Sequence, residues 1–238
     1  MKITILDNAT LAKTSLTCIE ELGELTTYEL TSPEQVVAHS QGADVLITNK
    51  VVLNRDTISQ LKTLKLICVS ATGTNNVDLN AAEEFGIAVT NVAGYSTPSV
   101  VQHTFSLVTN LLGNTHRYQR DCQQGAWQKS EMFCRLDYSF NDLQGKTFAI
   151  IGGGTLGKGV ATVAQAFGAN VVVAERKGAS CREGRTPFEE VLKTADIISV
   201  HCPLTDETRD LISLDELKMM KPSSIIINTA RGGIINEA

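Results

Sequence analysis

The stretch TFAIIGGGTLGKGVATVAQAFGANVVVAE, residues 147–175, decides the fold of this chain. It opens with a short apolar run rich in β-forming residues, 147–151, and three glycines follow with G-x-G-x-x-G spacing. Apolar residues then recur at helical spacing up to Gly168. A second apolar run, 171–173, leads to the acidic residue Glu175. The order strand, glycine turn, helix, strand predicts a βαβ unit.

The glycine spacing predicts a dinucleotide site. Gly152 permits a tight turn, Gly154 lets the backbone approach a pyrophosphate, and Gly157 lets the helix pack close to the strand. The N-terminus of the following helix offers free N–H groups and positive partial charge to phosphates. Glu175 is placed to accept hydrogen bonds from the two hydroxyls of an adenosine ribose. The alternative is a tight βα turn without a ligand.

Composition narrows the class of protein. A chain of 238 residues, 42% apolar and 20% charged, fits a soluble globular protein with two domains. The net charge of −5, with no Lys/Arg cluster, argues against a nucleic-acid surface. No apolar run approaches the roughly 20 residues that span a bilayer, and the N-terminus lacks a signal-peptide core. The six cysteines form no C-x-x-C pair, which favours reduced thiols and a cytoplasmic protein.

Residues 1–99 alternate between predicted strands and helices, which implies a parallel, doubly wound sheet. We expect one helix to open at Ser32, with Ser32 as N-cap and Pro33 at the first helical position. The expected strands are 2–6, 25–30, 43–48, 66–69 and 87–90, and the other helices are about 10–22, 54–61 and 79–85.

Residues 100–238 are expected to form the second domain, entered through a long helix from about 97 to 121. We expect Trp127 to anchor a loop on apolar surface. Each of four expected strands ends in a polar or glycine-rich turn, so these turns should line one crevice. The strands are 147–151, 171–173, 197–200 and 225–227, with helices beginning at 187 and 214.

Arg231 is the most informative charged residue, because it ends a buried-looking strand among small residues. A guanidinium there can clamp a carboxylate and polarise a carbonyl oxygen, although a surface arginine is the alternative. The small polar loop 70–76 offers either backbone N–H groups for an anion or an ordinary turn. We interpret His201 as a cofactor-pocket wall, with a proton donor as the alternative. We interpret His103 as a structural hydrogen-bonding residue, with a place in the lining of the cleft as the alternative. Nothing has the spacing of a metal site or a hydrolase triad, so no metal is expected.

The sequence resembles the D-isomer-specific 2-hydroxyacid dehydrogenases, which transfer hydride between 2-hydroxy or 2-keto acids and a nicotinamide cofactor. The resemblance covers essentially the whole chain, and its N-terminus and residues 171–179 look most like the glycerate dehydrogenase (hydroxypyruvate reductase) branch. Its motifs are ATGTNNVD (71–78), NVAGYSTPSVVQHT (91–104), GGGTLG (152–157), HCPLTDETR (201–209) and NTARGGIINEA (228–238).

The resemblance implies a flavodoxin-like substrate domain, 1–99, and an NAD-binding Rossmann domain, 100–238, incomplete at its C-terminus, with the active site between them and a dimer formed through the cofactor domain. It implies that Arg231 binds the substrate carboxylate and keto oxygen and belongs to the cofactor pocket. The remaining implied residues are Thr72, Gly73 and Thr74 for the carboxylate; Gly152, Gly154, Thr155, Leu156, Gly157 and Glu175 for the dinucleotide; and Thr104, Cys202, Pro203, Thr229 and Ala230 for the nicotinamide half.

Two departures from the family pattern matter. Glu175 stands where many relatives have Asp and favours NAD, while the following Arg176 and Lys177 keep NADP possible. The family's catalytic histidine and its acidic partner lie downstream of the arginine motif, beyond Ala238, so we expect these 238 residues to bind cofactor but turn over about 10² to 10⁴ more slowly. The other activities left open are D-lactate, phosphoglycerate or formate oxidation, and a non-enzymatic co-repressor-like role.

Overall fold

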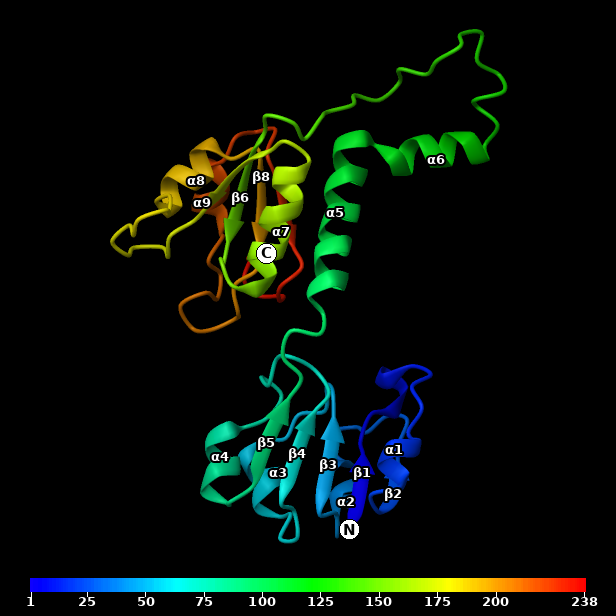
Figure 1. Ribbon diagram of the computed structural model, residues 1–238, viewed down its shortest axis with the longest axis vertical. Helices are drawn as coiled ribbons and strands as arrows, with labels where there is room; N and C mark the ends of the chain where they lie inside the picture. The colour runs from blue at the N-terminus through cyan, green and yellow to red at the C-terminus, as the bar shows by residue number, and fades with distance from the viewer. The chain divides into compact units, whose positions relative to one another are not determined.

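The computed structural model describes all 238 residues and divides them into two compact units, Met1–Tyr95 and Ser96–Ala238 (Figure 1). Both units are parallel sheets with helices, which confirms the expected α/β class. The division expected after residue 99 falls inside the first turn of α5 (Thr97–Gly113). No helix of the structure combines the length and the apolar character that a membrane span requires.

The first unit has a five-stranded sheet in the order β2-β1-β3-β4-β5, with every neighbouring pair parallel. Its main core includes Leu46 and Ile67 from central strands and Ile58 from α3, all buried. The strands are β1 (Lys2–Ile5), β2 (Glu24–Thr27), β3 (Val45–Thr48), β4 (Leu66–Val69) and β5 (Ala88–Asn91); the helices are η1 (Asn8–Leu11), α1 (Thr17–Glu20), α2 (Val36–Ser40), α3 (Arg55–Ser59) and α4 (Leu79–Glu84).

The second unit has a four-stranded parallel sheet in the order β7-β6-β8-β9. Successive residues of β6 point to opposite faces, so Phe148 and Ile150 pack with α5 and α7, and Ala149 and Ile151 pack with α8 (Figure 1). Its elements are α5, α6 (Thr115–Gln123), β6 (Thr147–Ile151), α7 (Thr155–Ala166), β7 (Asn170–Val173), α8 (Phe188–Thr194), β8 (Ile197–Val200), α9 (Leu214–Met219) and β9 (Ile225–Asn228).

Both units carry the same aspartate clamp at the start of their sheets. In each, an aspartate immediately before a strand accepts a hydrogen bond from the backbone N–H that begins the neighbouring strand, at 2.9 Å and 2.8 Å. The other oxygen of each aspartate accepts from a lysine near the start of the next strand, at 2.8 Å and 2.9 Å. The two sets are Lys2, Asp44 and Lys65, and Thr147, Asp196 and Lys221. The sheets therefore share strand order and a register device.

Two predicted helices of the first unit are wrong in extent. The helix expected over 10–22 is a 3-10 turn, Asn8–Leu11, followed by α1, because Ala12 takes a positive φ of 54° and interrupts the helical path. The helix expected to open at Ser32 begins at Val36. The Ser32 hydroxyl donates to Glu34 instead of capping a helix, which leaves 33–35 as a turn.

The long helix expected over 97–121 is also wrong, since it breaks into α5 and α6 at Asn114. Asn114 adopts the left-handed conformation, with φ 50°, which asparagine tolerates better than most residues. Its side-chain amide donates to the Ser139 carbonyl at 2.7 Å. The break therefore redirects the chain into α6 and the following segment, residues 126–140, which we call the arm.

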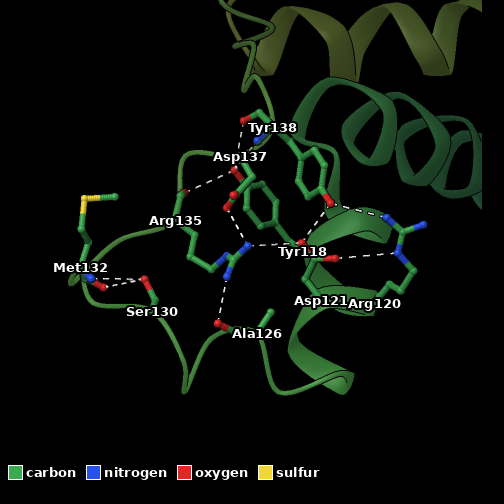
Figure 2. Close-up of polar contacts among 9 residues, drawn as sticks. All are labelled: Tyr118, Arg120, Asp121, Ala126, Ser130, Met132, Arg135, Asp137 and Tyr138. Atoms are coloured by element: carbon green, nitrogen blue, oxygen red, sulfur yellow. Dashed lines mark hydrogen bonds and ion pairs between the residues drawn. The ribbon is translucent and has the colours of Figure 1, made fainter.

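A polar network fixes the arm to α6 (Figure 2). The Tyr118 hydroxyl donates to the Tyr138 carbonyl, and the Tyr138 hydroxyl donates to Asp121, each at 3.0 Å. Arg135 donates to the Ala126 carbonyl at 2.9 Å within the arm, and its Nη2 lies 3.6 Å from the Asp121 carboxylate of α6. Trp127 was expected to anchor this segment on apolar surface, and that expectation is wrong, because its side chain is 53% exposed. Polar contacts hold the arm instead.

Candidate functional site

The glycine turn after β6 is built by close backbone contact with the end of β8. Gly152 has a φ of +100°, and a Cβ atom there would lie 2.5 Å from the Cys202 nitrogen. A Cβ on Gly157 would collide with the Gly152 carbonyl, so the helix lies tight against the turn. A Cβ on Gly154 would meet nothing within 4 Å. Two glycines are therefore required by the protein's own packing, and Gly154 borders open space.

The N-terminus of α7 is open for an anion. Gly154 is its N-cap and no side chain caps the helix, so the first N–H groups, including those of Thr155 and Leu156, have no side-chain acceptor. Gly154 and Thr155 are exposed. An uncapped helix terminus after a glycine turn has the donors and the positive partial charge that a diphosphate needs. The residues present fit a dinucleotide cofactor at this place.

Glu175 follows β7 at the same edge of the sheet and is only 3% exposed. Its carboxylate accepts from the backbone N–H of Arg176 at 2.8 Å. The Arg182 guanidinium binds both oxygens, through Nε at 2.7 Å and Nη2 at 2.6 Å. These hydrogen bonds, led by that of Arg182, lower the pKa of Glu175 to about 2. The acid expected to receive a ribose is thus engaged by a loop arginine that the sequence did not single out.

His201 and Cys202 follow β8 and are both electrically neutral groups. The His201 ring is 8% exposed, its Nε2 lies 2.8 Å from the Ser199 hydroxyl, and its Nδ1 has no partner. Burial lowers the pKa of His201 to about 4 and raises the pKa of the Cys202 thiol. His201 lies against Gly152 through its backbone, in keeping with its interpretation as a wall of the pocket.

The end of β9 brings Thr229 next to Thr104 of α5, with their hydroxyl oxygens 3.1 Å apart. Asn228 shapes the following turn: its side chain accepts from the Ala230 N–H at 3.0 Å and donates to the Arg231 carbonyl at 2.9 Å. The Arg231 side chain is exposed, and its Nη1 donates to the Ala230 carbonyl at 2.8 Å. Asn228 is therefore a positioning residue for the turn that carries Arg231.

In the first unit, the loop after β4 presents backbone donors. The N–H groups of Thr72, Gly73 and Thr74 make no hydrogen bond within the protein. The Thr72 hydroxyl donates to the Val92 carbonyl at 2.8 Å, and Asn91 donates to the Thr72 carbonyl at 2.7 Å. The loop is thus held by its carbonyl and hydroxyl groups, which leaves three N–H groups available to an acceptor.

Sequence reasoning missed three residues of this region: Arg182, Arg185 and Asn228. The loop that carries both arginines reads only as polar, and no spacing rule relates it to Glu175. Asn228 did have a signal, since a side-chain amide directly after a strand often shapes the next turn. His103 was expected to make a structural hydrogen bond, and this is wrong: it is exposed on α5 and makes none. No three His, Cys, Asp or Glu side chains gather as a metal site, and all six cysteines are free.

The NAD-binding domain model of the D-isomer-specific 2-hydroxyacid dehydrogenases matches residues 105–238. The chain belongs to this family. Its members are NAD-dependent oxidoreductases, so the resemblance drawn from the motifs is confirmed, as is a nicotinamide cofactor.

The relatives agree with this assignment. A putative 2-hydroxyacid dehydrogenase of Haemophilus influenzae is 49% identical over 213 residues, which are 89% of this chain and 68% of that protein. The glycerate dehydrogenase of Methylorubrum extorquens is 42% identical over 212 residues, 89% of this chain and 67% of that enzyme. Among solved structures, an acyclic imino acid reductase in complex with NADPH and D-arginine matches with a TM-score of 0.87 and 26% identity, over 100% of this chain and 76% of its own.

Gly152→Ala tests the backbone contact of the turn. We expect the free energy of unfolding to fall by about 2–4 kcal/mol, because the new methyl group collides with Cys202 and the positive φ is strained. NADH binding should weaken about tenfold or more, since the turn's donors are displaced. Urea unfolding and NADH titration measure the two effects.

Gly145→Ala is the matched control, because Gly145 also has a positive φ, 73°, but nothing lies within 4 Å of its Cβ position. It should lose only about 1 kcal/mol, from backbone strain, and keep NADH binding. Equal losses in the two variants would show that close packing at Gly152 is unimportant.

Because the pKa of His201 is lowered in the folded state, we expect the protein to lose stability in mild acid. The unfolded state takes up a proton on this ring at a pKa of about 6.5, but the folded state does so only at about 4. Lowering the pH through this window therefore favours unfolding, by at most about 3 kcal/mol. His201→Gln should flatten this part of the curve when unfolding is measured by urea at pH 6.5, 5.5 and 4.5. Parallel curves for the two proteins would contradict the expectation.

Proposed function

We propose that this protein reduces hydroxypyruvate to D-glycerate with NAD(P)H, within the general D-2-hydroxyacid dehydrogenase chemistry of its family. The similarity to a glycerate dehydrogenase, 42% identical over 89% of the chain, supports the choice of substrate. The glycine turn beside Cys202, with its uncapped helix, is the observation that carries the cofactor half of the proposal. The bound nicotinamide supplies the hydride.

The residues that we propose to bind the dinucleotide fall into groups, each contacting a different part of the cofactor. Gly152, Gly154, Thr155, Leu156 and Gly157 contact the diphosphate, and Glu175 receives the adenosine ribose. A second group, whose side chains carry no charge, lines the nicotinamide half: Thr104, Cys202, Pro203, Thr229 and Ala230. We further propose that residues 100–238 are the dinucleotide domain and residues 1–99 the substrate domain.

Arg231 is the proposed catalytic residue. Its guanidinium is always charged and has paired N–H donors, which suit a carboxylate and an adjacent keto oxygen. It is exposed and has no acidic partner, so it is available to a ligand. The free N–H groups of Thr72, Gly73 and Thr74 are the proposed second set of donors to the substrate carboxylate.

Arg231→Ala should weaken binding of the keto acid about tenfold to a hundredfold, because a charged hydrogen-bonding pair is lost. NAD binding should change little. Calorimetric titration of hydroxypyruvate into the complex with oxidised NAD measures this without turnover, and pyruvate and phosphohydroxypyruvate titrated in parallel should bind more weakly.

Arg117→Ala controls for the loss of a surface arginine, because Arg117 lies on α6 and makes no ion pair. It should bind hydroxypyruvate as the wild type does. An Arg231→Ala protein with unchanged keto-acid affinity would remove Arg231 from the site, and a preference for pyruvate would reject the proposed substrate.

We also propose that the protein is a cytoplasmic homodimer that associates through its second unit. The arm carries apolar side chains that the chain itself does not cover, Phe133 being 99% and Leu136 78% exposed. The network around Arg135 holds the arm in a defined shape, which lowers the entropy cost of association (Figure 2). Six free cysteines agree with a reducing compartment.

Replacing Phe133 and Leu136 together by Asp should shift the protein from dimer to monomer, because charged groups oppose burial of the arm. Sedimentation velocity across a range of concentrations measures the shift. Leu30→Asp is the control, since Leu30 is 72% exposed in the other unit, and it should leave the dimer intact. A wild-type monomer at all concentrations would refute the proposed dimer.

A further inference from the structure

Two arginines from one loop reach the proposed cofactor site, one at Glu175 and one at the glycine turn. Residues 176–186 leave β7 at Glu175 and return beside it, with the Glu175 N–H donating to the Thr186 carbonyl at 2.8 Å. Arg182 binds the Glu175 carboxylate. Arg185 lies over the glycine turn: a Cβ on Gly153 would be 2.6 Å from its Nη1 and 3.0 Å from its Nη2.

The Glu175 carboxylate has no free acceptor capacity. A carboxylate offers about four lone-pair positions, and four hydrogen bonds reach this one. Two come from backbone N–H groups, those of Arg176 and Arg182, and two from the Arg182 guanidinium. A ribose with two free hydroxyls can therefore bind Glu175 only where the Arg182 side chain withdraws. The Arg182 side chain is 60% exposed, so solvent is open to it.

For a cofactor with a 2′-phosphate, the Arg182 side chain favours binding. An unpaired carboxylate repels such a phosphate, but here the Arg182 guanidinium already neutralises Glu175 at 2.6 Å. Its charge is delocalised, and it can donate to a phosphate through N–H groups that the carboxylate does not use. Arg182 thus opposes the ribose diol of one cofactor and favours the phosphate of the other.

The neighbouring cations do not replace Arg182 in this role. Lys177 is engaged elsewhere, since its Nζ lies 2.8 Å from the Glu216 carboxylate. Arg176 touches Glu175 through its backbone N–H alone. Arg185 lies at the glycine turn, where it adds positive charge for either cofactor. Arg182 is the one side chain of the loop that contacts the acid.

We propose that Arg182 sets the cofactor preference of this enzyme, by occupying Glu175 so that NADP(H) is accepted alongside NAD(H). The inference rests on the proposed function in placing the adenosine ribose at Glu175. It makes Arg182 a specificity-determining residue that the motif G-x-G-x-x-G followed by an acid does not indicate.

Arg182→Ala tests the proposal by cofactor binding to the 238-residue chain, with no turnover needed. Fluorescence titration gives Kd for NADH and for NADPH separately. The wild type should bind both, with Kd values within about tenfold of each other. In Arg182→Ala, NADH should bind more tightly and NADPH more weakly, so that the ratio of Kd(NADPH) to Kd(NADH) rises about tenfold or more.

Two further variants keep the test decisive. Arg182→Lys retains a cation beside Glu175 and so protects the fold, and its ratio should rise less than that of Arg182→Ala. Arg55→Ala removes an arginine from another exposed carboxylate, Glu84 in the first unit, and should leave the ratio unchanged. An unchanged ratio in a folded Arg182→Ala protein that binds cofactor would overturn the role of Arg182. Failure of the wild type to bind either cofactor would overturn the proposed function and this inference together.

Discussion

The site depends on one steric constraint, the contact between Gly152 and the backbone of His201 and Cys202. Adjacent parallel strands bring their carboxyl ends to one edge, and β6 and β8 are neighbours there. Only a residue without Cβ lets the chain leave β6 at a φ of +100° while the end of β8 passes 2.5 Å from the vacant Cβ position. The tight fit of Gly157 against the same turn then fixes where α7 begins. Close packing against the glycine turn therefore sets the position of the helix terminus.

The two units solve the same problem of aligning parallel strands in the same way, although the chain shows no internal sequence repeat. Their first four strands have one order, and an aspartate before the third strand of each unit ties down the first. Buried apolar residues in strands can be exchanged for others of similar volume, so two units with the same fold can have little sequence similarity. Asp44 and Asp196 each give the first backbone N–H of the neighbouring strand an acceptor at the end of the sheet.

Much of this arrangement could be read from the sequence, and the failures have physical causes. The strand 147–151 and the glycine turn were placed correctly, because periodicity and the lack of a Cβ are local properties. The helix expected over 97–121 failed because one left-handed residue, Asn114, ends α5, and the apolar spacing that predicted the helix stops at Leu112. Arg182 was missed because its role depends on where a polar loop returns, and loop composition does not encode that. The roles of Arg231 and of the loop 72–74 remain predictions.

The charges at the strand ends of the second unit explain how its edge suits an anionic cofactor. Burial keeps His201 uncharged at neutral pH and opposes ionisation of Cys202. Glu175 is ionised, but the Arg182 guanidinium compensates its charge. Because His201, Cys202 and the Glu175–Arg182 pair contribute no net charge, positive charge at the edge is left to the uncapped α7 terminus, Arg185 and Arg231. All of these attract anions. This edge therefore suits anionic groups such as the proposed diphosphate and carboxylate, and Arg182 of the loop 176–186 offsets the one buried acidic charge there.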